Sequence, residues 1–434
     1  MKPERYLLEN NIGFSSVYSD KFKTEQLTLY LVMPLENEAE ASRLALLPRV
    51  LRRGCRDYPE TAMLLRRLEE LYSTDLSTGA FKVGERHVLF FSVNSLREDF
   101  LPNRERLLPQ VVRLLLSVVF APYIDGTTGV FSDEYVEGEK VNACRAIASL
   151  QNNKSSYATL RCVSLMCRGE AYAVHEWGNE GETAKITPAA LFDTYRRVLS
   201  EAQLEFYYAG TADTEAIQEM IRKEIAPIRR HPLNLPATAV PRSAKKTRKY
   251  TEKAMIVQGK LCMGFRTGIT MTDEDSAAFY LFHAIYSQFP SSKLFMNVRE
   301  RLSLCYTCGS AAELSKGILL VKAGIDNKNK RKAVHEILRQ LRRMRAGKFT
   351  EEEMLLAKQM LAFHIRSIED EPAAVRRWYL GRSLSGISQT PEELWEAIER
   401  VTARDVVRVA KRLSLDTVYF LRGTETTGEE ADDE

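Results

Sequence analysis

The chain has 434 residues, of which 44% are hydrophobic and 28% are charged. This length allows two or three domains of about 150 residues each, and the composition is that of an ordinary globular protein. The net charge is +4, but the segment after Thr424 holds six acidic residues and no basic one, which leaves 62 basic against 52 acidic residues, or +10, in the rest. That excess is too small for the basic footprint of a nucleic-acid-binding protein.

Membrane insertion and secretion are not expected. The longest apolar run, Leu114–Ala121, is far shorter than the roughly 18 residues of a transmembrane helix. The first residues, MKPERYLLENNIGF, lack the apolar core and the small-residue cleavage site of a signal peptide. Seven cysteines at irregular spacing indicate reduced thiols. We therefore expect a cytoplasmic protein.

The first half of the chain alternates strand and helix patterns. Thr28–Met33 has the period-two pattern of a strand, and Glu38–Arg53 and Glu60–Leu71 have the spacing of amphipathic helices. Val88–Val93 is predicted to be a further strand. Four prolines and few large apolar residues then indicate an extended linker at Ile225–Tyr250.

The second half follows the same order of elements. Its predicted strands and helices are Leu261–Arg266, Glu274–Ser287, Lys293–Leu302, Leu304–Gly309 and Ile318–Ala323. Another helix is predicted to begin at Thr350, where Glu353 is placed to complete a capping box. Sequential strands with helices on one face of each sheet predict an α+β fold with mostly antiparallel sheets.

The two halves are similar in sequence as well. Residues 294–323 align with 64–93 at an offset of 230, and shorter stretches near 349 and 418 align with 131 and 205 at offsets of 218 and 213. Matches in the same order with slowly changing offsets indicate a tandem duplication. The predicted organisation is an N-terminal unit at 1–224, a linker at 225–250, a C-terminal unit at 251–424 and an acidic, disordered tail at 425–434.

The segment Ser291–Ser310, SSKLFMNVRERLSLCYTCGS, resembles the C-terminal half of the pitrilysin/insulinase (M16) metallopeptidases. The family pattern there is SS-x-LF-x-x-[VI]-RE-x-x-GL-x-Y, from which this chain departs at Ser303, where the family has Gly. The resemblance extends through GILLVKAGID and FTEEEMLLAKQML and is greatest with the short, processing-peptidase-like class. It implies two duplicated α+β units of the M16 and LuxS-like type, which agrees with the internal repeat.

M16 peptidases carry an H-x-x-E-H motif on the first helix of the first unit. Its two histidines lie on one helical face and bind zinc, and its Glu activates a metal-bound water. Aligned on the residues that follow the motif in the family, these positions are Ala45, Pro48 and Arg49. None of the three can serve as a zinc ligand or as the base. Pro48 also predicts that the helix kinks or starts late.

The remaining zinc ligand of the family is absent too. It is the last Glu of an E-R-x-V-x-x-x-E pattern, which falls on Ala146 in the segment Glu139–Ala146. The six histidines offer no substitute, because the two nearest in sequence, His335 and His364, are 29 residues apart. We therefore expect no metal in this chain.

The chain keeps a second feature of the family. In M16 enzymes an Arg and a Tyr, seven residues apart in the second unit, bind a peptide carbonyl and donate to the developing oxyanion. The resemblance assigns these roles to Arg299 and Tyr306. The alternative is that Arg299 is a surface helix residue and Tyr306 a strand residue packed beneath it.

The cysteines give weaker signals. Cys305-x-x-Cys308 lies on a predicted strand, where residues three apart point to opposite faces, so we expect buried thiols and no redox or zinc pair. Cys162 and Cys167, on a helical segment, are expected to be buried thiols as well.

These observations predict a metal-free, non-catalytic subunit of a heterodimeric M16-type zinc peptidase. A homologous partner with an intact H-x-x-E-H motif would hold the zinc, and Arg299 and Tyr306 would act in trans on a peptide bound there. Zinc-less relatives are also labelled as associated with elongation factor P modification. That label is a name and gives no evidence of a reaction. Two alternatives stay open: a peptide-binding homodimer that does not cleave, and a structural protein like the core subunits of the respiratory bc1 complex.

Overall fold

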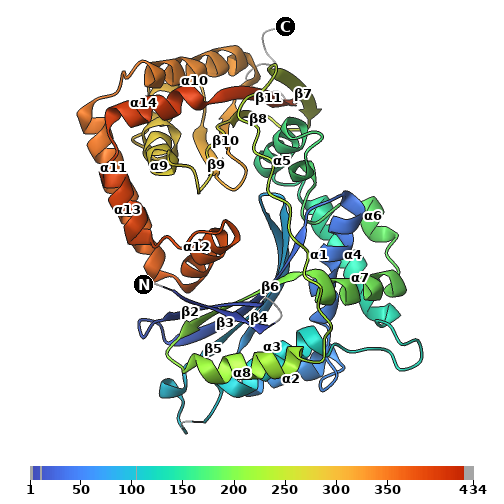
Figure 1. Cartoon of the computed structure of the whole chain (residues 1–434). Helices are drawn as coiled ribbons and strands as arrows, with labels where there is room; N and C mark the ends of the chain where they lie inside the picture. The colour runs from blue at the N-terminus through green and yellow to red at the C-terminus, as the bar shows by residue number, and fades with distance from the viewer. Residues whose placement is uncertain (1–2, 10–11, 104, 425–434) are drawn as a thin grey trace. The chain divides into compact units, whose positions relative to one another are not determined.

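A computed structural model describes residues 3–9, 12–103 and 105–424 (Figure 1). Contacts divide the chain into two compact units, and neither is continuous in sequence. The first consists of Met1–Ser149, Val174–Ala237 and Pro372–Arg377, and the second of Leu150–Ala173, Thr238–Glu371 and Trp378–Glu434. The predicted acidic tail lies outside the described residues. Within the described ranges, no helix is long and apolar enough to cross a membrane.

The described part of the first unit contains a six-stranded sheet with the order β1-β2-β6-β3-β5-β4. Its strands are β1 (Glu4–Leu8), β2 (Ile12–Tyr18), β3 (Thr24–Pro34), β4 (Asp75–Val83), β5 (Arg86–Leu96) and β6 (Gln203–Gly210). All neighbouring strands are antiparallel except β2 and β6, which are parallel. Strand β4 therefore forms one edge of the sheet.

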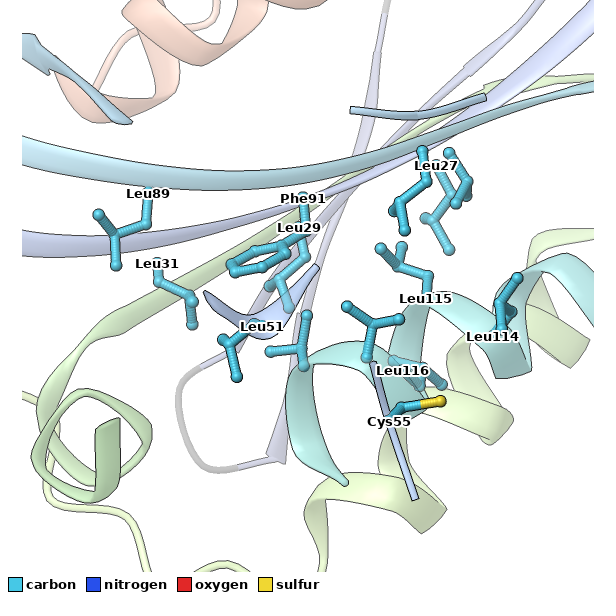
Figure 2. Close-up of a cluster of buried hydrophobic side chains, with 14 of the residues drawn as sticks. Leu27, Leu29, Leu31, Leu51, Cys55, Leu89, Phe91, Leu114, Leu115 and Leu116 are labelled. Carbon is cyan, nitrogen blue, oxygen red and sulfur yellow. The ribbon is translucent and has the colours of Figure 1, made fainter. Parts of the chain in front are cut away.

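Helices of the first unit pack against this sheet or against one another and bury the apolar side chains of the sheet. They are α1 (Glu38–Leu51), α2 (Thr61–Glu70), α3 (Leu108–Phe120), α4 (Asp133–Ser149), α6 (Glu180–Ala184), α7 (Pro188–Glu201) and α8 (Thr214–Ile225). Figure 2 shows the resulting core, in which Leu29 and Phe91 of the sheet point toward Leu115 of α3 and Leu51 at the end of α1. Burial of such apolar surface is the main force that holds the layers together.

Helix α1 begins where the sequence predicts. The side chain of Asn37 accepts a hydrogen bond from the Glu40 amide at 3.0 Å, which caps the first turn. Pro48 lies in the last turn, and the helix closes three residues later at Leu51. The amide of Arg52 still donates to the Pro48 carbonyl at 3.2 Å. Pro48 thus affects the end of the helix and not its start.

The described residues of the second unit form a five-stranded sheet with the order β7-β11-β8-β10-β9. Its strands are β7 (Arg248–Ala254), β8 (Gly259–Arg266), β9 (Thr307–Glu313), β10 (Ile318–Ile325) and β11 (Ser414–Gly423). Only β7 and β11 are parallel to each other. The order repeats β2-β6-β3-β5-β4 of the first unit, including the position of the parallel pair. The predicted α+β fold of two homologous units is confirmed.

The second unit contains several helices that come after β8 in sequence. They are α9 (Ser276–His283), α10 (Lys330–Arg345), α11 (Glu351–Arg366), α13 (Pro391–Glu399) and α14 (Ala403–Arg412), and α12 (Pro372–Leu384) is divided between the units. Two π-helical turns, Ala284–Gln288 and Phe295–Arg301, lie between α9 and β9. The predicted capping box at Thr350 is present, with Thr350 and Glu353 exchanging hydrogen bonds at 3.0 and 2.8 Å.

Helix α5 (Lys154–Met166) joins the second unit although it precedes the linker in sequence. Cys162 and Met166 pack with Cys262 and Tyr419 in a separate apolar cluster on that sheet. Cys162 and Cys167 are fully buried, as predicted. No helix or strand is formed between Ile225 and Arg248. The predicted boundaries at 224 and 250 were taken from the duplication in the sequence. Whether the units fold separately at these boundaries stays a prediction.

Candidate functional site

The positions aligned with the zinc motif lie beside a cavity of the first unit. Its volume is about 510 Å³. It is lined by residues of α1 and the segment just after it, of α2, of the edge strand β4, of β5 and of α4. The lining residues are Ala45, Arg49, Arg52, Arg53, Thr61, Leu65, Thr78, Gly79, Ala80, Phe90, Glu139 and Trp177.

The cavity contains two of the four predicted positions. Ala45 and Arg49 are one helical turn apart on α1, and both line the cavity. Pro48 points its carbonyl toward the edge strand, where it accepts from Thr78 Oγ1 at 3.2 Å. Ala146 does not line the cavity, whereas Glu139, two turns earlier on α4, does. The structure therefore brings Ala45 and Arg49 together with Glu139 and not with Ala146.

The lining does not fit zinc. Of the residue types that bind zinc, it offers only the carboxylate of Glu139. The position of a second histidine is filled by the guanidinium of Arg49, which stays protonated and has no free lone pair for a metal. Across the described parts of the chain, no group of three or more His, Cys, Asp or Glu side chains could hold a metal ion.

Positive charge dominates the cavity instead. Arg53 lies 3.6 Å from Glu139 and places its guanidinium 5.2 Å from the centre of the Tyr135 ring. Arg49 is half-buried and Arg52 is exposed, and within the described residues neither forms an ion pair or a side-chain hydrogen bond. The cavity therefore holds three guanidinium groups and one carboxylate.

The nearby buried acid of α1 does not compensate this charge. Glu40 does not line the cavity and pairs with Arg43 at 2.7 Å and with Arg197. Its carboxylate is thus committed to other cations. Arg49 and Arg52 remain without a counter-ion from their own helix.

Trp177 closes the cavity next to the edge strand. Its indole Nε1 donates to the carbonyl of Ala80 at 3.2 Å, and its amide donates to His175 Nδ1 at 3.0 Å. The next residue, Gly178, has φ +66°, and a Cβ atom there would lie 1.9 Å from Ser42 Oγ. Only glycine lets this segment approach α1 so closely.

Sequence analysis did not identify Arg52, Arg53, Glu139 or Trp177 as cavity residues. A signal existed for the arginines, because Arg49, Arg52 and Arg53 recur at the three- and four-residue spacing of one helical face. Trp177 had no local signal, since a contact far away in sequence brings it to β4.

The predicted pair of the second unit is presented to solvent. Arg299 lies in the π-helical turn Phe295–Arg301 with its side chain 41% exposed, 4.5 Å from the Phe295 ring centre and 3.5 Å from Glu300. Tyr306 is 65% exposed and its amide donates to the Gly324 carbonyl at 3.0 Å. Within the described residues, the Tyr306 hydroxyl has no hydrogen-bond partner. The alternative prediction, in which Tyr306 is packed beneath Arg299, is therefore wrong.

The prediction for the neighbouring cysteines was wrong in its geometry. Strand β9 begins at Thr307, so Cys305 precedes it and the two thiols do not project from opposite faces of one strand. The proximity of the two thiols lowers the pKa of the Cys305 thiol and raises the pKa of the Cys308 thiol. Cys305 is buried and Cys308 is half-buried.

Comparison with known proteins identifies the family. Residues 185–361 match the family model described as the peptidase M16 inactive domain. The chain is 33% identical over 409 residues to the probable inactive metalloprotease YmfF of Bacillus subtilis (strain 168), which covers 94% of this chain and 95% of that protein.

Two solved structures share the fold over nearly the whole chain. A conserved protein from Enterococcus faecalis V583 has a TM-score of 0.89 and 28% identity, covering 99% of this chain and 100% of that one. The peptidase M16 inactive domain from Pseudomonas fluorescens has a TM-score of 0.78 and 16% identity, covering 98% and 100%. The chain therefore belongs to the peptidase M16 family, as an inactive metalloprotease homologue.

Proposed function

We propose that this chain is the metal-free, non-catalytic subunit of a heterodimeric M16 zinc peptidase. A homologous subunit with an intact H-x-x-E-H motif would hold the zinc, and this chain would supply Arg299 and Tyr306 to the bound peptide. The observation that supports this role is the exposure of both side chains. Tyr306 is fixed through its backbone at Gly324, while its hydroxyl is free to donate to another molecule.

The two side chains suit different steps of peptide hydrolysis. A tyrosine hydroxyl donates one hydrogen bond, which stabilises an oxyanion more than the carbonyl from which it forms. A guanidinium binds a peptide carbonyl throughout the reaction and so acts mainly on binding. In the proposed complex, the partner's zinc would polarise the scissile carbonyl. Tyr306 would stabilise the charge that develops there, and Arg299 would hold the peptide.

The test is a reconstituted complex of this chain with a homologue that carries H-x-x-E-H. Tyr306→Phe should lower kcat by about 10²–10³-fold, because one oxyanion donor is lost with little change in volume. Arg299→Ala should mainly raise KM. Tyr18→Phe is a matched control, since Tyr18 is an exposed tyrosine of the first unit.

Assembly is measured separately by size-exclusion chromatography with light scattering. If both variants assemble and the complex cleaves at the wild-type rate, the pair has no role in catalysis and the chain is a scaffold. A peptide-binding protein that does not cleave is the second candidate. It is supported by the cavity of the first unit, which requires no metal to hold a peptide group.

A further inference from the structure

We propose that the cavity of the first unit binds a carboxylate of a peptide, with Arg49 as the residue that recognises it. The carboxylate would take the place that the family reserves for the metal and its ligands. This inference goes beyond the proposed peptidase role, because it concerns the isolated chain and needs no zinc-bearing partner. It deepens the second candidate, a peptide-binding protein, by naming the group of the peptide that is recognised.

The first observation that supports the proposal is the uncompensated positive charge of the cavity. Arg53 has a carboxylate within 3.6 Å, in Glu139, but Arg49 and Arg52 have no ion-pair partner in the described part of the chain. Arg49 is also half-buried, so part of its hydration is lost before any ligand binds. A guanidinium in such a place gains most from a planar, bidentate anion, and a carboxylate has that geometry.

The second observation is the apolar lining and the size of the cavity. Leu65, Phe90 and Trp177 give it apolar surface beside the charged groups. A volume of about 510 Å³ lies within the range of small-ligand sites, which is about 300–1,000 Å³. It accommodates one end or one side chain of a peptide, and not a folded domain.

The third observation is that the edge strand β4 borders the cavity. Thr78, Gly79 and Ala80 line the cavity and belong to β4, which is an edge of the sheet. An extended peptide can pair with such an edge through its main chain. The Ala80 carbonyl is already occupied by Trp177 Nε1, so a paired peptide would have to end or turn there. Because Arg49 lines the same cavity, it could then bind a terminal carboxylate or an acidic side chain of that peptide.

The test is fluorescence anisotropy with the full-length chain and three pools of short, labelled peptides with neutral residues at the randomised positions. One pool has a free C-terminal carboxylate, the second a C-terminal amide, and the third an amide together with one internal Glu. The first or third pool should bind about tenfold or more tightly than the second, because a charge-assisted hydrogen bond to arginine is gained. Whether the first or the third binds tighter identifies the source of the carboxylate.

Two variants test whether Arg49 is responsible. Arg49→Ala should remove the preference for the acidic pool, and Arg49→Lys should restore only part of it, because lysine lacks the bidentate fork. Arg56→Ala is the matched control, because Arg56 is exposed, lies close in sequence and does not line the cavity. It changes the net charge by the same amount and should leave the preference intact.

The proposal is overturned if the acidic and amidated pools bind equally, or if none binds. Equal losses in Arg49→Ala and Arg56→Ala would also overturn it, because they would indicate long-range attraction only. Failure here leaves the peptidase proposal standing, since that proposal depends on Tyr306 and on a partner. Circular dichroism melting of each variant establishes that the fold is retained.

Discussion

Ser73 and Ser303 are equivalent residues of the two units, and both have a left-handed backbone, with φ 55° and 48°. The amide of Ser73 donates to the Glu69 carbonyl at 3.1 Å, and the amide of Ser303 donates to the Arg299 carbonyl at the same distance. Equivalent hydrogen bonds therefore end this helical segment in each unit, at the offset of 230 found in the sequence. The turns are not identical, because Tyr72 is also left-handed, with φ 57°, whereas its equivalent Leu302 has φ −103°. The departure from the family's Gly at Ser303 thus falls on a residue whose conformation favours glycine.

Ser303→Gly should stabilise the protein. A left-handed conformation costs a residue with a Cβ atom roughly 1–2 kcal/mol, and glycine loses about 0.5–1 kcal/mol of additional chain entropy on folding. The expected net gain is therefore about 0.5–1 kcal/mol. Urea unfolding, followed by circular dichroism, measures it as a rise in the transition midpoint at constant slope.

Ser303→Ala provides the control for this prediction. Alanine keeps the Cβ atom and therefore the backbone strain, so it should give no gain. Ser73→Gly should act in the same direction as Ser303→Gly, because Ser73 is left-handed as well. A lower midpoint in Ser303→Gly than in Ser303→Ala would mean that the left-handed turn is not strained.

The order of the elements could be predicted because their apolar patterns are strong. Leu261–Arg266 and Ile318–Ala323 were predicted as strands and lie within β8 and β10. Strand β9 was placed about three residues too early, since its residues, Thr307–Glu313, are mostly small and only half-buried. An edge strand of this kind has little hydrophobic alternation to predict it from.

Non-local contacts could not be predicted at all. Neither the packing of α5 in the second unit nor the bond between Trp177 and Ala80 leaves a pattern in neighbouring residues. The helix at Glu38–Arg53 was predictable from its apolar spacing, and the family pattern aligned Ala45 and Arg49 with the positions of the zinc motif. The charge of the cavity followed only when Arg53 and Glu139 were placed beside that helix.

The purified chain should bind no stoichiometric zinc. Ala45 and Arg49 offer no ligand, and Glu139 is the only acidic residue of the cavity lining. Mass spectrometric metal analysis after mild chelation checks this. About one zinc per chain that survives the chelator would contradict it.

Restoring the ligands gives the complementary experiment. The double variant Ala45→His/Arg49→His places two imidazoles one helical turn apart on the wall of the same cavity, so it should bind zinc more tightly than the wild type. Isothermal titration with zinc chloride compares the two proteins. Equal affinity would mean that the two positions do not face one ligand site.

Limited trypsin digestion should first cut between Arg242 and Lys249. This segment has no helix or strand before Arg248, and Arg242, Lys245 and Lys246 are exposed. Arg230, in the same linker, should be protected, because its guanidinium donates to the carbonyls of Leu199 and Ala202 at 2.6 Å. Mass spectrometry of the first fragments identifies the cut. Earlier cleavage within Ser291–Ser310 would contradict the packing of the Arg299 segment.

His87 should make the first unit sensitive to mild acid. Its ring is fully buried among the sheet residues under α1, and neither ring nitrogen has a hydrogen bond of normal geometry within the described residues. Burial lowers the pKa of His87 to about 4, although Glu176 and Glu40 favour the proton and Lys82 opposes it. In the folded protein His87 therefore stays neutral until the pH approaches 4. In the unfolded chain its pKa is the ordinary value of about 6.5, so that the ring takes up a proton at a higher pH.

The sign of the effect follows from proton linkage. Between pH 6.5 and about 4 the unfolded state binds more protons at this residue, so the free energy of unfolding falls as the pH falls. The loss should be about 2 kcal/mol at pH 5, since one pH unit corresponds to about 1.4 kcal/mol. His87→Leu removes the titrating group, and its urea midpoint should change less than the wild-type midpoint between pH 7 and pH 5. Replacing the exposed His231 by Leu serves as the control for the loss of a histidine as such. Parallel losses in His87→Leu and the wild type would show that other groups, His283 among them, account for the acid sensitivity.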